Sequence, residues 1–114
     1  MEDKVRQGYL YDFYGELLND HQKSIYESFV LEDLSLGEIA AAEGISRQAV
    51  HDVVRRCTKA LEGYESKLRL VEKFVCIREK VEKICDLTDQ PEGISSGKAT
   101  ERIRSLSREI LEEL

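Results

Sequence analysis

The sequence is poor in proline and in long apolar runs. It has one proline in 114 residues, and because proline breaks helix interiors, its scarcity leaves room for long helices. No apolar run approaches the ~20 residues that a membrane-spanning helix needs. The N-terminal segment MEDKVRQGY has no secretory apolar region. We therefore expect a cytoplasmic protein with no membrane span.

Residues with the spacing of a catalytic or metal site are also missing. The three cysteines, Cys57, Cys76 and Cys85, are odd in number, lack metal-ligand spacing and fall on apolar positions of helical patterns. They are expected to be reduced core thiols. There is no glycine-rich phosphate loop, no pair of histidines at metal-ligand spacing and no Ser, His and Asp arrangement that the expected helices would join. The sequence predicts neither an enzyme nor a cofactor or metal site.

The residues that are abundant favour helices. Leu, Ile, Ala, Glu, Lys and Arg dominate the chain, and all of them are compatible with helix interiors. The length, with 41% apolar residues, suits one ordinary domain or a compact head with a helical arm. The fold class is therefore predicted to be all-α, in one folded unit.

Basic residues, 17 in number, are outnumbered by 23 acidic ones but are concentrated in one segment. The net charge is −6, made up of −7 in residues 1–45, +4 in residues 46–83 and −3 in residues 84–114. A net negative charge disfavours non-specific binding of nucleic acid, because proteins bind its phosphates through basic surfaces. The basic segment could steer one helix towards phosphates, whereas the alternative is a mixed-charge helix that serves solubility alone.

The segment 35–56, SLGEIAAAEGISRQAVHDVVRR, has the pattern of a helix-turn-helix. Ser35 and Glu38 form a capping box that starts one helix near Leu36. Gly44 suits the left-handed residue that ends it, and Ser46 can cap a second helix from Arg47. The apolar face of that second helix is provided by Val50, Val53 and Val54.

Two helices are expected before this motif. Residues 9–18 carry apolar side chains at helical spacing, and Asp20 can cap a second helix from His21 to about Glu32. An aromatic cluster in the first helix could stack on bases, although aromatic residues at this spacing more often fill a core. Its members are Tyr9, Tyr11, Phe13 and Tyr14.

The order and spacing of these four segments resemble the fourth region of bacterial sigma factors. The motifs LSLGEIA and GISRQAV carry this likeness. Nearly all of the chain is similar to the YlxM family of small bacterial proteins, with the stretch from Tyr9 to Leu61 diagnostic and the last 25 residues much less so. The resemblance implies a sigma-factor region 4-like helix-turn-helix head that binds DNA. It also implies a regulatory or accessory role in the signal recognition particle pathway, because genes of this family usually lie beside those of the particle.

The helical pattern continues beyond the motif towards Leu87, with a break expected near Gly63. A helix of roughly 40 residues would be ~60 Å long, too long to bury its apolar stripes against a small head. Since large apolar patches are uncommon on monomers, we expect a homodimer. Its seam is predicted among Leu68, Val71, Phe74, Val75, Ile77 and Val81.

The predicted organisation has four parts. A helix-turn-helix head spans residues 1–62 and a helical arm residues 63–87. A loop spans residues 88–97, which include the only proline. An amphipathic helix over residues 98–114 has apolar residues at steps of three and four. It could fold back on the chain or remain a tail that folds on a partner.

The candidate nucleic-acid-binding residues lie on the second helix of the motif. Its first exposed side chains enter the major groove, where Arg can contact guanine and Gln can contact adenine. Basic residues further along would contact phosphates. The candidates are Ser46, Arg47, Gln48, His51, Arg55, Arg56 and Lys59. Asp52 and Glu43 oppose phosphate binding, so DNA affinity is expected to be weak.

Two alternatives to a DNA target remain open in the sequence. The same basic helix could bind structured RNA through phosphates and shape, including the RNA of the signal recognition particle. Alternatively, the helix-turn-helix could serve as a scaffold for a non-catalytic interaction protein whose arm and last helix bind protein components of that particle.

Overall fold

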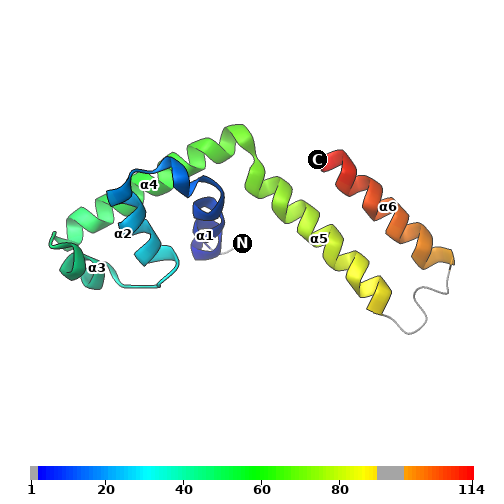
Figure 1. Cartoon of the computed structure of the whole chain (residues 1–114), viewed down its shortest axis with the longest axis horizontal. Helices are drawn as coiled ribbons and strands as arrows, with labels where there is room; N and C mark the ends of the chain where they lie inside the picture. Colours follow the sequence, from blue (N-terminus) through cyan, green and yellow to red (C-terminus); the bar gives the residue numbers. More distant parts are fainter. Residues whose placement is uncertain (1–2, 90–96) are drawn as a thin grey trace. The chain divides into compact units, whose positions relative to one another are not determined.

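The computed structural model describes residues 3–89 and 97–114, and this part of the chain is helical with no strand (Figure 1). The predicted all-α class is therefore confirmed. The chain divides into two compact units, Met1–Val71 and Glu72–Leu114, called here the head and the tail. The elements are α1 (Asp3–Tyr14), the 3-10 turn η1 (Gly15–Leu17), α2 (Asp20–Val30), α3 (Leu36–Glu43), α4 (Arg47–Leu68), α5 (Leu70–Asp89) and α6 (Gly97–Glu113).

Local caps start the helices of the helix-turn-helix where the sequence predicts them. The Ser35 hydroxyl accepts a hydrogen bond from the amide of Glu38, and the Glu38 carboxylate accepts one from the amide of Ser35. Gly44 follows α3 in the left-handed conformation, with φ of 70°. Ser46 then caps α4 by accepting a hydrogen bond from the Ala49 amide. Helix, turn and helix are therefore fixed by short-range chemistry.

The cap of α2 differs from the prediction. Asn19, not Asp20, is the N-cap residue, and it forms a capping box with Gln22, whose side chain accepts a hydrogen bond from the Asn19 amide. Asp20 is the first helical residue, where its negative charge still favours the helix dipole. The prediction failed because Asn and Asp are nearly equivalent as N-cap residues. Asn19 is the cap because Gln22, three residues after it, completes a capping box with it.

The core of the head forms around α4, on which α1, α2 and α3 all pack. Aromatic and aliphatic side chains fill it. Of the four aromatic residues of α1, Tyr14 is buried in this core, as the prediction that they fill a core requires, whereas Tyr9 and Tyr11 are half-buried and Phe13 is exposed. Each fully buried aliphatic side chain contributes about 1.5–3 kcal/mol of transfer free energy. The buried apolar residues of the head are Leu10, Tyr14, Leu18, Ile25, Tyr26, Ile39, Ala40, Val50, Val54, Cys57, Leu61 and Val71.

Polar contacts also bind the first two helices to α4. Arg6 of α1 donates two hydrogen bonds to the Glu62 carboxylate, at 2.6 and 2.8 Å. This guanidinium holds the pKa of Glu62 below its usual value, so the pair stays ionised near neutral pH. Tyr26 of α2 shares a hydrogen bond of 2.7 Å with the Thr58 hydroxyl. The inward face of α4 is therefore joined to α1 and α2 by polar as well as apolar contacts.

The helical pattern predicted to reach about Leu87, with a break near Gly63, is interrupted at Arg69 instead. Gly63 lies inside α4, so the break predicted there is wrong. Arg69 has a φ of 58° and donates its amide to the Glu65 carbonyl oxygen, which ends α4. The next helix starts at Leu70. Arg69 is neither glycine nor asparagine, the usual residues in this conformation, so sequence gives no local signal for the break.

A buried carboxylate explains why the chain turns at this point. The side chain of Glu65, only 6% exposed, accepts hydrogen bonds from the Tyr14 hydroxyl (2.6 Å) and the Val71 amide (3.0 Å). The Tyr14 hydroxyl in turn accepts one from the Leu70 amide at 3.1 Å. The first amides of a helix have no partner inside it. Two side chains from α1 and α4 therefore cap α5, and burial together with the Glu65 bond raises the pKa of Tyr14.

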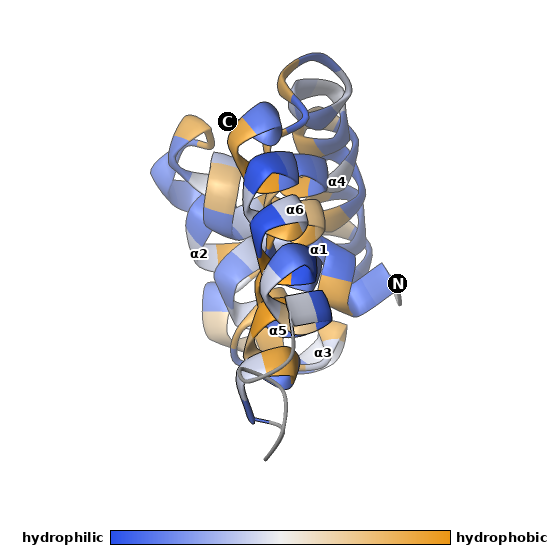
Figure 2. Ribbon diagram, turned by 90° about the vertical axis from the view of Figure 1, so that its right-hand side faces the viewer, coloured by the Kyte–Doolittle hydropathy of each residue, from blue (hydrophilic) through white to orange (hydrophobic). Residues whose placement is uncertain are grey.

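The tail contains most of α5 together with α6, which are drawn side by side in Figure 1. Both ribbons alternate between hydrophobic and hydrophilic segments in Figure 2. Ala99 and Leu106 of α6 are buried within this unit, which supports the alternative in which the last helix folds back. Of the predicted loop, residues 88–89 belong to α5 and residue 97 to α6, and the remaining seven residues lie outside the described residues.

The three cysteines do not share one environment, contrary to the prediction of three core thiols. Cys57 is buried, Cys76 is half-buried and Cys85 is exposed. Burial raises the pKa of the Cys57 thiol, as expected for a core cysteine. The other two lie on α5, where the apolar stripe is only partly covered.

Candidate nucleic-acid interface

The second helix of the helix-turn-helix, α4, has two faces of opposite character. Its buried residues Val50, Val54, Cys57 and Leu61 recur at steps of three and four and pack into the head. Because a helix repeats every 3.6 residues, the positions between them project on the other side. The hydrophobic pattern of the sequence therefore determines which side chains of α4 face outwards.

All seven predicted nucleic-acid-binding residues lie on the outward side. They belong to α4 or to its N-cap, and each is exposed. Four of them recur every fourth residue and follow one side of the helix over about 18 Å, at 1.5 Å per residue. This row, called here the basic row, consists of Arg47, His51, Arg55 and Lys59. Gln48 and Arg56 lie beside it.

Three members of the basic row have no partner within the described residues. No hydrogen bond or ion pair joins Arg47, Arg55 or Lys59 to another side chain of residues 3–89 or 97–114. Arg56 donates only to the Asp52 carbonyl oxygen, at 3.4 Å. These cations are therefore available to an external anion without breaking an internal contact.

The N-terminal turn of α4 contains one polar cluster. Gln48 donates a hydrogen bond of 3.1 Å to the Asp52 carboxylate, and Nδ1 of His51 lies 3.8 Å from the same oxygen. Asp52 is the only acidic residue on this face, because Glu62 is paired with Arg6 and Glu65 is buried in the head. The local charge of the exposed face is therefore positive with one carboxylate inserted.

Glu43 is the second carboxylate that the sequence predicted to oppose phosphate binding, and in the structure it accepts a hydrogen bond within the head. Glu43, the last residue of α3, accepts a hydrogen bond of 2.8 Å from the Ser24 hydroxyl of α2. This contact joins the first helix of the motif to the helix before it. Glu43 is thus used in part to assemble the head, which leaves Asp52 as the principal acidic group of the interface.

The predicted dimer seam consists of residues with different exposure. Leu68, Phe74 and Val81 are exposed, whereas Val75 and Ile77 are half-buried. Val71 is 1% exposed and belongs to the core of the head. The structure therefore assigns Val71 to the interior of its own chain, where its amide donates a hydrogen bond to the buried Glu65 carboxylate.

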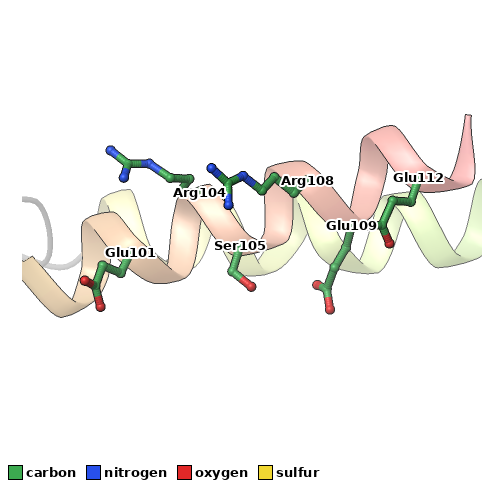
Figure 3. A pocket seen from close by; sticks show the side chains of 6 residues that line it. All are labelled: Glu101, Arg104, Ser105, Arg108, Glu109 and Glu112. Carbon is green, nitrogen blue, oxygen red and sulfur yellow. The ribbon is translucent and has the colours of Figure 1, made fainter.

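The tail offers one further polar surface, on α6. Figure 3 shows its side chains along the helix, with Arg104 and Arg108 on one side and Glu101, Ser105 and Glu109 on the other. Together with Glu112 they line a shallow hollow. Alternating charges of both signs are typical of a solvated helix face, so this hollow is a weaker candidate than α4.

The described residues contain no cluster of His, Cys, Asp and Glu that could hold a metal ion. None of their helices combines the length and apolar character that a transmembrane span requires.

Sequence reasoning missed the pair of Tyr14 and Glu65. A signal was present, because Glu65 follows Leu61 by four residues and continues the stripe that Val54 and Cys57 begin. A carboxylate at an apolar helical position is costly to bury unless it is hydrogen-bonded. Such a residue indicates a specific buried partner, although only the fold identifies it as Tyr14.

A capped helix, a left-handed glycine turn and a second helix with an outward polar face together define a helix-turn-helix protein. Family comparison is in accord: residues 1–100 match the family model UPF0122, described as "Putative helix-turn-helix protein, YlxM / p13 like". The chain belongs to this family, as its resemblance to YlxM proteins predicted.

Relatives of similar length support the assignment. UPF0122 protein YlxM of Bacillus subtilis is 42% identical over 114 residues, which cover 100% of this chain and 97% of the relative. A UPF0122 protein of Shouchella clausii is 42% identical over 106 residues, covering 93% and 92%. One from Caldanaerobacter subterraneus is 52% identical over 75 residues, covering 66% and 64%. The likeness to the first two extends through most of the chain, the tail included.

Proposed function

We propose that this chain is a non-catalytic regulatory protein that binds duplex DNA by placing the start of α4 in the major groove. The observation that carries the proposal is the exposed basic row on α4, whose cations Arg47, Arg55 and Lys59 have no partner in the described part of the chain. Recognition helices of helix-turn-helix proteins contact base edges with their first residues. Here those residues are Arg47 and Gln48.

The roles of the other residues follow from their positions along α4. Arg55, Arg56 and Lys59 lie two to three turns after the first helical residue, where a helix leaving the groove passes the phosphates. Ser46 accepts the Ala49 amide with its hydroxyl oxygen, so the hydroxyl proton remains available to a phosphate. His51 lies between the two groups. Base reading is therefore assigned to the first turn and backbone contact to the later turns.

The proposal predicts two separable kinds of defect. The double variant Arg47→Ala, Gln48→Ala should lose sequence preference, because each good base contact contributes about 1–3 kcal/mol of discrimination. Arg56→Ala should weaken binding to all sequences and reduce the slope of log K against log salt by about 0.9, the value for one phosphate contact. Anisotropy titrations of duplex DNA at several salt concentrations measure both quantities.

The same titrations distinguish DNA from the alternative ligand. A hairpin RNA corresponding to that of the signal recognition particle is titrated in parallel. Tighter binding of this RNA, with no preference among duplex DNA sequences, would replace DNA by RNA as the target. Unchanged binding in both variants would remove α4 from the interface altogether.

We further propose that the protein is a homodimer joined through the tail. Phe74 and Val81 of the tail expose 39% and 44% of their surface, and a two-helix unit with little buried apolar surface gains stability from a partner. Leu68, 52% exposed at the end of α4, is a predicted seam residue that belongs to the head. Light scattering of the full chain at micromolar concentration should give about twice the mass of 13.1 kDa. Val81→Glu should lower that mass, whereas Glu82→Ala, one residue further on, should not. A monomeric wild-type chain would refute the dimer.

A further inference from the structure

The single carboxylate on the exposed face of α4 contacts a residue that is proposed to read bases. Asp52 Oδ1 lies 3.1 Å from Gln48 Nε2 and 3.8 Å from His51 Nδ1. Both Gln48 and Asp52 are exposed, and the side chain of Asp52 is 50% accessible. The Asp52 carboxylate therefore lies on the same side of α4 as the basic row, so any ligand bound to that row is also close to this carboxylate.

The chemistry of this contact fixes the orientation of the Gln48 amide. An ionised carboxylate only accepts hydrogen bonds, so the amide must turn its NH₂ group, and not its carbonyl oxygen, towards Asp52. One N–H is then used by Asp52, while the second N–H and the carbonyl oxygen remain free. Adenine presents one acceptor and one donor in the major groove, which Gln can contact through this pair of atoms.

The charge of Asp52 acts in addition to this orienting contact. Asp52 lies one turn before Arg55 and Arg56, the residues assigned to phosphates. Two unit charges 4 Å apart interact with about 1 kcal/mol in bulk water and more near a protein surface. A carboxylate among these cations therefore weakens every phosphate contact, whatever the base sequence.

We propose that Asp52 is a specificity-determining residue of the DNA interface: it orients Gln48 for adenine and lowers the affinity of α4 for phosphates of any sequence. Both effects raise the ratio of specific to non-specific binding, which is the quantity that matters when non-specific sites are in large excess. This inference depends on the proposed DNA-binding function and assigns a role to a residue that otherwise only opposes it.

Two substitutions separate the orienting effect from the charge. Asp52→Asn removes the charge but keeps an oxygen that can accept from Gln48, whereas Asp52→Ala removes both. We expect each to bind a 30-base-pair duplex of random sequence about three- to tenfold more tightly, in line with the loss of one like charge near phosphates. Only Asp52→Ala should also lose the adenine preference, measured by selecting a randomised duplex library and sequencing the bound fraction.

The controls match the charge and the contact separately. Asp86→Asn, at an exposed acidic residue of α5, removes the same charge from the tail, which carries none of the proposed DNA contacts, and should leave both quantities unchanged. Gln48→Ala should lose the adenine preference without tighter random-duplex binding. In the double variant Gln48→Ala, Asp52→Ala, the preference should fall no further than in Gln48→Ala alone, because contacting residues couple.

The outcomes also distinguish this inference from the proposed function. A wild-type chain that does not bind duplex DNA at low salt refutes the function itself. If the wild type binds but Asp52→Asn leaves random-duplex affinity unchanged, the electrostatic role is wrong. If Asp52→Ala keeps the full base preference while Gln48→Ala loses it, the orienting role is wrong.

Discussion

Glu65→Ala is expected to destabilise the head by about 2–4 kcal/mol, a large part of the 5–15 kcal/mol typical of a domain. The substitution leaves the Tyr14 hydroxyl and the Val71 amide without the carboxylate that accepts their hydrogen bonds. A buried donor without a partner costs about 1–3 kcal/mol. Urea denaturation of the full chain, followed by circular dichroism, measures the loss as a lower midpoint.

A matched control lies on the same helix. Glu62→Ala removes an equal side chain whose ion pair with Arg6 is about 40% exposed, and exposed pairs contribute about 0–1 kcal/mol. Tyr14→Phe tests the other half of the buried contact, since it removes the acceptor of the Leu70 amide. A double-mutant cycle of Tyr14→Phe with Glu65→Ala should show coupling. Equal losses in Glu62→Ala and Glu65→Ala would contradict the importance of burial.

The helix-turn-helix could be predicted in detail because its determinants are local. The Ser35 and Glu38 capping box, the left-handed Gly44 and the Ser46 cap each involve residues within three or four positions of one another. Such interactions depend little on the rest of the chain. The structure therefore reproduces them at the predicted residues.

The end of α4 could not be predicted, because its cause is not local. Nothing between Gly63 and Leu70 breaks a helix by its own propensity. The turn at Arg69 is instead stabilised by Tyr14, which lies 51 residues before Glu65 in the sequence. A sequence without a fold offers no way to pair these two residues. The break predicted near Gly63 followed from the low helix propensity of glycine alone and falls six residues before the observed end of α4 at Arg69.

The candidate interface is an intermediate case. Its exposure could be predicted from the spacing of Val50, Val54 and Leu61, which fixes the outward face. The contact of Gln48 with Asp52 is also compatible with sequence, since residues four apart are neighbours on a helix. Which of the many such pairs forms a hydrogen bond depends on rotamers, and only the structure shows it.

The two faces of α4 separate stability from binding, and neighbouring residues can test this. Leu61 is fully buried and Lys59 is exposed two positions earlier. Leu61→Ala creates a cavity between α4 and the helices packed on it, and such substitutions cost about 2–5 kcal/mol. Lys59→Ala should change the free energy of unfolding by no more than about 0.5 kcal/mol.

For DNA binding, Lys59→Ala should have the larger effect of the two variants, the reverse of their order in stability. Lys59→Ala should weaken duplex DNA binding and reduce the salt slope by about 0.9, as expected for one lost phosphate contact. Leu61→Ala, titrated at a temperature at which circular dichroism shows it fully folded, should retain the wild-type slope because every cation of α4 is still present. Denaturation and salt titration of both variants measure the four values. A Leu61→Ala slope as low as that of Lys59→Ala would show that packing and binding on this helix are not separable.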